Sequence, residues 1–328
     1  MSNVRKTRYI GLDLARTIGC IGIIWIHTVS ISHVGSIGQL GRFAVPFFSV
    51  SSLFLLIRSK KTGTFFKESR QRLVRLLTPF AFWSLFYIGF RHLGASILGN
   101  SPPSFGIDIL WTGPTHHLWF CPYLAAVSTI AYWIKFGDCK EHLRNYVGSI
   151  TLVVSTVILC EIAQRNYPLN GDYTLRLSID TLPAAVFGIL LGLSDDKAIK
   201  WFFEIRPFIL VWLIAGFTAY LLTVGRSLTV ENAFGVSVFL LAMNTCLEVR
   251  WPVVLKLLAS AGGLSFGVYF IHVLYVEGLQ DLFQLLHVAP GVQLDLLVFV
   301  LSCFLSVFSM FVCVHLLPAK VARWIGAI

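Results

Sequence analysis

The apolar stretch from residue 9 to residue 32 constrains the fold more than any other part of this chain. It is long and apolar enough to cross a bilayer, yet it contains Asp13, Arg16 and His27. Because Arg16 and His27 are eleven residues apart, a helix would place both on one face, separated by a rise of about 16 Å. Ionisable side chains in membrane helices avoid lipid. We therefore expect this face to line a wet cavity or, as the alternative, to form a buried contact that only locks helices together.

The composition extends this expectation to the whole chain. Of the 328 residues, 56% are hydrophobic and 13% are charged, and the mean hydropathy is +0.76. A soluble core needs far less apolar material, so the composition predicts a polytopic membrane protein. We expect the first apolar run to remain as a span, because it is too long for a signal peptide and has no small-residue cleavage pattern.

The distribution of basic residues and cysteines argues against several other classes of protein. The formal net charge is +10, but Lys and Arg gather between apolar runs, which indicates membrane topology and not nucleic-acid binding. The seven cysteines are scattered, without a CxxC pair or a histidine at zinc-ligand spacing. We therefore expect neither a disulfide framework nor a metal site.

Apolar windows of about 20 residues predict ten transmembrane helices. They lie near residues 9–32, 41–58, 73–91, 117–135, 147–163, 178–193, 207–224, 230–248, 262–284 and 292–317. With a cytoplasmic N-terminus, twenty of the 26 Lys and Arg residues fall on the cytoplasmic side, as the positive-inside rule expects. The basic residues on the opposite side are Arg42, Arg91, Arg165, Arg176 and Arg226, and Arg16 lies within the first span.

The predicted fold is therefore all-α. We expect a polytopic integral membrane helical bundle of about ten transmembrane helices, with both termini cytoplasmic. It would form a single domain over residues 1–328 with no appended soluble domain, because no segment between the predicted spans is long enough to fold separately.

A basic pair precedes the third predicted span. Arg72 and Arg75 are three residues apart, which places them on one helical face at the predicted cytosolic side. Paired guanidinium groups recognise phosphate through bidentate hydrogen bonds. The pattern thus indicates a site for a phosphorylated cytosolic ligand, and attraction to anionic lipid headgroups is the alternative.

Two segments near the start of the second and fourth spans carry further candidate residues. Ser51 follows Phe47 and Phe48, in a stretch for which helix packing is the simpler interpretation and ligand contact the alternative. His116 and His117 precede the fourth span. Adjacent residues on a helix point in different directions, so we expect at most one of these histidines to face a cavity, with a solvated interfacial histidine as the default.

The ninth span carries a polar stripe. Ser265, Tyr269 and His272 have the spacing i, i+4 and i+7, which places a hydroxyl, a phenol and an imidazole on one helical face. Polar stripes in membrane helices point inward. Alone, His272 is equally typical of a structural hydrogen bond and of a functional group, and its neighbours favour function.

Taken together in chain order, these residues resemble the membrane acyltransferase-3 family, whose members acylate hydroxyls of bacterial cell-surface sugars. The motifs that carry the resemblance span nearly the whole chain: Leu12, Asp13, Arg16 and His27; Phe47, Phe48 and Ser51; Arg72, Arg75 and Pro79; His117 to Phe120; Ser265, Tyr269 and His272. Two positions depart from the family pattern. The family usually has glycine where this chain has Ser52, a change expected to narrow the cavity, and proline where it has Val273.

The resemblance implies a membrane-embedded O-acyltransferase, specifically an O-acetyltransferase, in the cell inner membrane. Its partners would be the lipid bilayer, a sugar or polysaccharide acceptor such as an exopolysaccharide, and acyl-CoA as donor substrate, with no bound cofactor. Arg72 and Arg75 would hold the phosphates of the donor on the cytosolic side.

The resemblance also implies roles for the first span. His27 would act as the general base for a sugar hydroxyl, or as a nucleophile that forms an acyl-histidine. Arg16 would orient the donor or offset negative charge on the thioester oxygen, and Asp13 would hold Arg16 in place. The residues with supporting roles would be Ser51, His117, Ser265, Tyr269 and His272.

Two other functions suit the same pattern. Ten spans with ionisable residues facing a cavity are also typical of a transporter of anions or sugars, although no paired Gly- or Pro-broken helices occur in matching positions of two halves. A non-enzymatic partner in glycan assembly would carry the same residues in purely structural roles. Acylation of a glycan that depends on His27 distinguishes the enzyme from both.

Overall fold

The computed structural model describes residues 10–29, 35–60, 63–137, 155–158, 173–205, 207–224, 227–244 and 253–327. Throughout these ranges the regular structure is helical and no strand occurs, which confirms the all-α prediction. The predicted spans other than 147–163 coincide with helices. The span predicted at 147–163 lies almost entirely outside the described residues.

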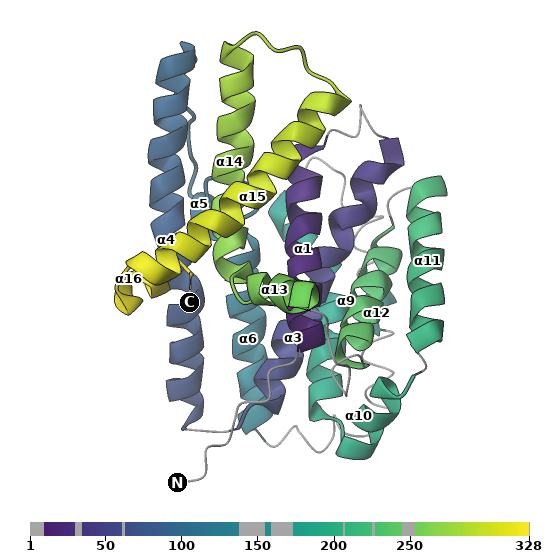
Figure 1. Ribbon diagram of the computed structural model, residues 1–328. Coiled ribbons are helices and arrows are strands. Elements are labelled where there is room, and N and C mark those ends of the chain that lie inside the picture. The colour runs from purple at the N-terminus through teal and green to yellow at the C-terminus, as the bar shows by residue number, and fades with distance from the viewer. Residues whose placement is uncertain are drawn as a thin grey trace.

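The longer helices follow the order of the predicted spans (Figure 1). They are α1 (Ile10–Thr28), α3 (Ala44–Arg58), α4 (Phe65–Leu98), α6 (Phe120–Phe136), α9 (Tyr173–Leu193), α11 (Pro207–Thr223), α12 (Leu228–Asn244), α14 (Ser265–Leu285) and α15 (Val292–Leu316). Shorter elements lie between or after them: η1 (Gly35–Phe43), α5 (Ile109–Thr112), α10 (Asp196–Phe203), α13 (Val253–Gly262) and α16 (Ala319–Trp324). The helix α4 begins upstream of the predicted third span, where Thr64 caps its N-terminus by accepting a hydrogen bond from the Lys67 N–H.

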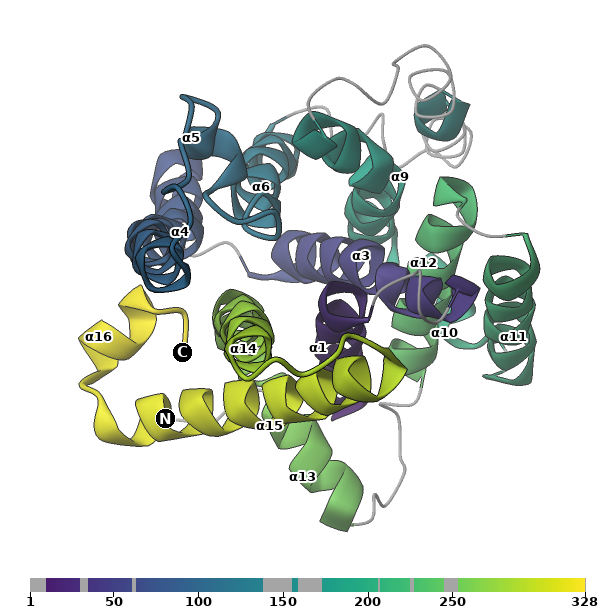
Figure 2. The ribbon, with the colours of Figure 1, turned by 90° about the horizontal axis from the view of Figure 1, so that it is seen from above.

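The helix α1 lies at the centre of the bundle. Seen from above, α3, α12, α14 and α15 surround it (Figure 2). It contributes apolar side chains to one buried core shared with α4, α14 and α15, and to another shared with α3, α9 and α12. Because protein packs around α1 on several sides, its polar side chains meet groups from distant parts of the chain.

Several helices have the length and composition of membrane spans. Within the described ranges, five segments qualify: Ile10–Thr28, Gly35–Arg58, Phe65–Ile97, Thr174–Leu193 and Val292–Leu316. A sixth candidate is the pair Asp196–Phe202 and Pro207–Thr223, which is bent by 61°. These segments fit a membrane protein, and the count of about ten spans with cytoplasmic termini stays a prediction.

The packing of α9 against α3 depends on two glycines spaced i, i+4. A Cβ on Gly188 would lie 2.6 Å from the carbonyl oxygen of Val50, and a Cβ on Gly192 would lie 2.8 Å from Cβ of Ile57. Small residues at this spacing let membrane helices approach closely, which matters because burial from lipid supplies no hydrophobic driving force between helices. This contact fixes the position of α9, and so of the polar residues that α9 carries.

We predict that Gly188→Ala destabilises the protein by about 1–3 kcal/mol, because the added methyl group forces α9 away from the backbone of α3. Gly216→Ala in α11 is the matched control, since a Cβ there meets nothing within 4 Å. Thermal unfolding of the purified protein in detergent, followed by tryptophan fluorescence, measures both variants. Equal stability of the two variants would contradict the close packing of α3 and α9.

Candidate functional site

A pocket of about 100 Å³ lies at the C-terminal end of α1. This volume is several times the roughly 10–15 Å³ that one water molecule needs by the same measure, so the pocket has room for part of a substrate. Aromatic and aliphatic side chains form much of its wall. Its polar lining includes His27, Arg42, His116, His117, Asp180, Thr181, Glu231, Asn232 and Tyr269.

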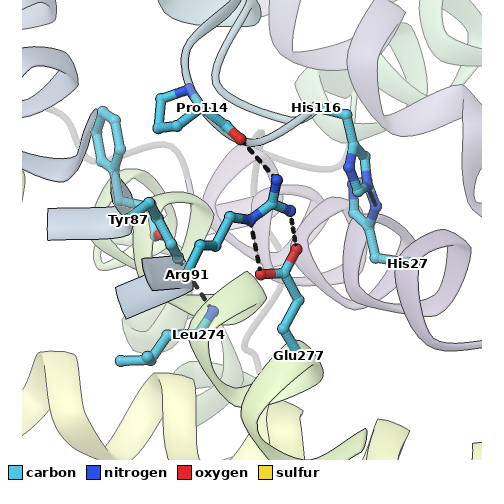
Figure 3. A network of polar contacts seen from close by, with 8 residues as sticks. His27, Tyr87, Arg91, Pro114, His116, Leu274 and Glu277 are labelled. Atoms are coloured by element: carbon cyan, nitrogen blue, oxygen red, sulfur yellow. Dashed lines mark hydrogen bonds and ion pairs between the residues drawn. The ribbon is translucent and has the colours of Figure 1, made fainter. Parts of the chain in front are cut away.

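Four histidines meet beside this pocket. Nδ1 of His27 and Nε2 of His116 are 3.1 Å apart, a hydrogen-bond distance (Figure 3). The ring centroid of His27 lies 5.3 Å from that of His272 and 6.2 Å from that of His117, and the centroids of His117 and His272 are 4.9 Å apart. The fold thus brings together His27, His117 and His272, which the sequence places in separate predicted spans. His116 joins the same cluster.

Both His116 and His117 line the pocket, so the expectation that at most one would face a cavity is wrong. That expectation assumed a helix from residue 117, but α6 begins at Phe120 and both histidines lie in the preceding turn. Tyr269 donates a hydrogen bond to the backbone carbonyl of His117 and fixes this turn against α14. The buried ring of His117 has no hydrogen-bond partner at either nitrogen among the described residues.

The hydrogen bonds of His272 define its tautomer. Its Nδ1 lies 3.2 Å from the carbonyl oxygen of Val268 and 2.8 Å from that of Tyr269. Because carbonyl oxygens only accept, we assign the ring proton to Nδ1, which makes Nε2 the basic nitrogen. His272 is fully buried and lies outside the pocket lining, whereas His27 is partly exposed and lines it. Of these two histidines, His27 is therefore the one that can meet a substrate.

An ion pair positions the turn that carries His116 (Figure 3). Arg91 in α4 contacts both carboxylate oxygens of Glu277 in α14, with 3.2 Å between Nε and Oε2, and its Nη1 donates to the Pro114 carbonyl at 2.7 Å. Bidentate pairs of this kind add geometric specificity to charge attraction. The sequence contains one signal for this contact: Arg91 and Glu277 have opposite charges and lie near the outer ends of their predicted spans.

The hydroxyl of Tyr87 is inserted into α14 beside His272. It donates to the carbonyl oxygen of Phe270 at 2.7 Å and accepts from the N–H of Leu274 at 3.0 Å. In a regular α-helix these two backbone groups bond to each other. Buried Tyr87 therefore ties α4 to the backbone of α14 on either side of His272.

Close approach of η1 to α1 places Arg42 in the pocket. A Cβ on Gly41 would lie 2.0 Å from the carbonyl oxygen of Gly22, so only glycine fits here. The Arg42 guanidinium donates to Gln39 and lines the pocket with His27. In the sequence Arg42 counts only among the basic residues on the side opposite the cytoplasm. Its place beside His27 is not apparent from the sequence, because the two residues lie on separate elements.

The basic pair in α4 divides between interior and surface. Arg72 is partly buried and donates to the hydroxyl of Ser52 in α3, while Arg75 is exposed. The buried Nε of Arg72 has no hydrogen-bond partner in the described part of the chain. Ser52 lies one helical turn beyond Phe48, which lines the pocket, and does not line it itself. The serine that departs from the family pattern thus contacts Arg72 and does not narrow this pocket.

The other predicted site residues lie away from the pocket. Arg16 forms an ion pair with Asp13, with 2.9 Å between Nη1 and Oδ1, near the start of α1. Along α1, Arg16 is separated from His27 by a rise of about 16 Å. Ser51 and Ser265 also lie outside the pocket lining. Of the polar stripe in α14, only Tyr269 and His272 belong to the histidine cluster.

These features define the class of the molecule: a helical membrane protein with a partly buried histidine cluster beside a pocket that contains several polar groups. Within the described ranges, no group of three or more His, Cys, Asp or Glu side chains is arranged to hold a metal ion. The chain belongs to the acyltransferase-3 family, whose model, described as an acyltransferase domain, matches residues 9–315. The matched region covers nearly the whole chain.

A similarity to one curated protein covers a smaller part of the chain. An amino-acid racemase of Enterococcus faecalis is 30% identical over 167 residues, which are 46% of this chain and 22% of that protein. The match therefore spans about a fifth of that racemase. No solved structure matches the chain.

We predict that Tyr87→Phe destabilises the protein by about 1–3 kcal/mol, because the Phe270 carbonyl and the Leu274 N–H lose their partner in a buried site. Tyr220→Phe in α11, where the ring is 38% exposed, is the control and should unfold like the wild type. Thermal unfolding in detergent measures the difference. Wild-type stability of Tyr87→Phe would mean that α14 closes its own hydrogen bond at this point.

Proposed function

We propose that this protein is an inner-membrane O-acetyltransferase that moves an acetyl group from cytosolic acetyl-CoA to a hydroxyl of a cell-surface or exported sugar. Family membership supports acyl transfer. The observation that carries the proposal is the position of His27, which is partly exposed in the pocket and hydrogen-bonded to His116. Buried His272 lies behind it.

In this proposal His27 acts as a general base. The sugar hydroxyl gives its proton to the imidazole as the hydroxyl oxygen attacks the carbonyl carbon of the thioester. The tetrahedral intermediate then loses the sulfur, and the imidazolium returns the proton to the departing thiolate of CoA. His116 orients the ring of His27 through their hydrogen bond, the role that a second group has for the base in other acyl-transfer sites.

Arg72 supports binding of the donor. Its partly buried guanidinium keeps a donor hydrogen at Nε and contacts Ser52, one turn from the pocket lining. Such a group can bind a phosphate of CoA or the thioester oxygen. Arg75, exposed on the same helix, would contact the phosphates nearer the surface, and Arg16 with its partner Asp13 would contact the donor at the start of α1.

A nucleophilic role of His27 is the second chemical route. The imidazole would attack the thioester, release CoA and pass the acetyl group to the sugar in a second step. This route forms a labelled protein when radiolabelled acetyl-CoA is supplied without acceptor, and the general-base route does not.

We predict that His27→Gln abolishes acetylation of the glycan, because glutamine keeps a hydrogen-bonding group of similar reach but cannot take up the proton. Loss of a general base slows a reaction by roughly 10²–10⁴-fold. His315→Gln at the exposed end of α15 is the matched control. The assay is ester analysis of glycans from a deletion strain complemented with each variant, with membrane levels compared by immunoblot.

Acetylation at the wild-type level with His27→Gln would refute the proposed base. Two further outcomes distinguish the other functions. Uptake of an anion or sugar into proteoliposomes without acylation would favour a transporter. A glycan phenotype that requires the protein but none of its polar pocket residues would favour a non-enzymatic partner in glycan assembly.

We predict that Arg72→Gln raises the KM for acetyl-CoA by roughly 10-fold or more, since a hydrogen bond to a charged group contributes about 1.5–3 kcal/mol. Arg58→Gln is the control, because Arg58 forms an exposed pair with Asp196 and such pairs contribute little. Initial rates of the purified protein at varied acetyl-CoA provide the measurement. An unchanged KM would remove Arg72 from the donor site.

A further inference from the structure

The pocket has a second polar wall that the acyl-transfer step does not use. Asp180 in α9 and Glu231 in α12 both line it and are 4% and 5% exposed. His117 lines the same pocket, is 3% exposed, and has no hydrogen-bond partner at either ring nitrogen among the described residues. Buried polar groups are nearly always hydrogen-bonded, and a water molecule or a ligand hydroxyl in the pocket can supply such a partner to this imidazole.

Asn232 bonds to the backbone of α9 at Asp180. The N–H of Ala184 donates to Oδ1 of Asn232 at 3.1 Å, and Nδ2 of Asn232 donates to the carbonyl oxygen of Asp180 at 2.7 Å. In a regular helix these two backbone groups bond to each other, and Pro183 beside them has no N–H. The Asn232 amide therefore ties α9 at Asp180 to α12 next to Glu231.

Within the described residues, two guanidinium groups lie near the two carboxylates. Arg176 lies one turn before Asp180, with 4.0 Å between its Nε and Oδ2, and Arg42 lines the pocket. Carboxylate acceptors with a guanidinium donor suit a neutral ligand whose groups both donate and accept hydrogen bonds. Sugar hydroxyls do both. The phosphates of CoA offer no donor, and the negative charges of Asp180 and Glu231 would repel them.

Aromatic rings complete the wall. Phe48, Trp119 and Phe120 line the pocket together with the polar groups. Their apolar faces can pack against the C–H groups of a sugar ring, while the carboxylates take its hydroxyls. A mainly apolar wall with a few convergent polar groups is typical of small-ligand sites.

We propose, resting on the function proposed above, that Asp180 and Glu231 bind hydroxyl groups of the acceptor sugar. They accept hydrogen bonds from hydroxyls other than the reacting one, which leaves the reacting hydroxyl toward His27. Asn232 is a positioning residue, because its amide bonds to the backbone of α9 at Asp180 and Ala184. The acceptor thus occupies the pocket, and the donor reaches it from the side of Arg72.

The test is the kinetics of the full-length protein in lipid nanodiscs. Radiolabelled acetyl-CoA is the donor, and the acceptor probe is surface glycan isolated from the deletion strain, which lacks the ester. Asp180→Asn and Glu231→Gln keep the shape of each side chain and remove its charge. Each should raise the KM for the glycan about 10- to 100-fold, the range for a lost hydrogen bond to a charged group, with the KM for acetyl-CoA unchanged.

Glu204→Gln is the matched control, because Glu204 is exposed at the end of α10 and paired with Lys200. It should leave both KM values unchanged. Asn232→Ala should raise the KM for the glycan and also lower the unfolding temperature, since the Ala184 N–H and the Asp180 carbonyl lose the side-chain amide to which they bond. Glu231→Asp retains a carboxylate and should recover part of the affinity that Glu231→Gln loses.

A wild-type KM for the glycan in Asp180→Asn and Glu231→Gln, with unchanged unfolding temperatures, would overturn the proposal. An increase confined to the KM for acetyl-CoA would also overturn it, because it would place the donor here.

Glycan binding without donor, followed through tryptophan fluorescence, separates this proposal from the proposed function. Binding that the two variants lose, with no acetyl transfer by the wild type, would support the sugar site and refute the transferase. Absence of glycan binding by the wild type would refute the sugar site.

Discussion

The hydrogen bond between His27 and His116 joins the end of α1 to the turn before α6, and the pocket is built around this contact. In an apolar bundle a buried polar group without a partner costs free energy, so polar side chains from different helices converge. Arg91 and Glu277 hold the same turn through the carbonyl of Pro114. The position of His116, and through it the orientation of His27, therefore depends on an ion pair between α4 and α14.

Two helices beside the pocket are bound by side chains in the same way. The Tyr87 hydroxyl bonds to the Phe270 carbonyl and the Leu274 N–H in α14, and the Asn232 amide bonds to the Asp180 carbonyl and the Ala184 N–H in α9. Hydrogen bonds between helices are one of the forces that hold membrane helices together. Here they tie a neighbouring helix to α14 beside His272 and to α9 at Asp180.

How well the sequence predicts a part of this site depends on how far apart along the chain the interacting residues lie. Hydropathy predicts α1 closely, and the spacing of Tyr269 and His272 predicts a shared face, because both signals lie within one helix. Helical rotation also placed Arg16 and His27 on one face, but the rise along the axis keeps Arg16 out of the pocket. Asn232 contacts a backbone group 48 residues away, and no local pattern encodes such a partner.

The proposed reaction connects His27 and Arg72, which lie on separate helices, α1 and α4. Arg72 contacts Ser52, and one turn nearer the pocket on α3 lies Phe48, in the wall that His27 also lines. In that proposal a donor held by Arg72 would extend along α3 toward His27, and the acceptor would contact Asp180 and Glu231 in the same pocket. The carboxylates would favour hydroxyl groups that donate hydrogen bonds, and the Arg72 guanidinium would favour phosphate, so the two proposed sites differ in the ligand chemistry that they suit. In this arrangement the histidines would move a proton where the two substrates meet.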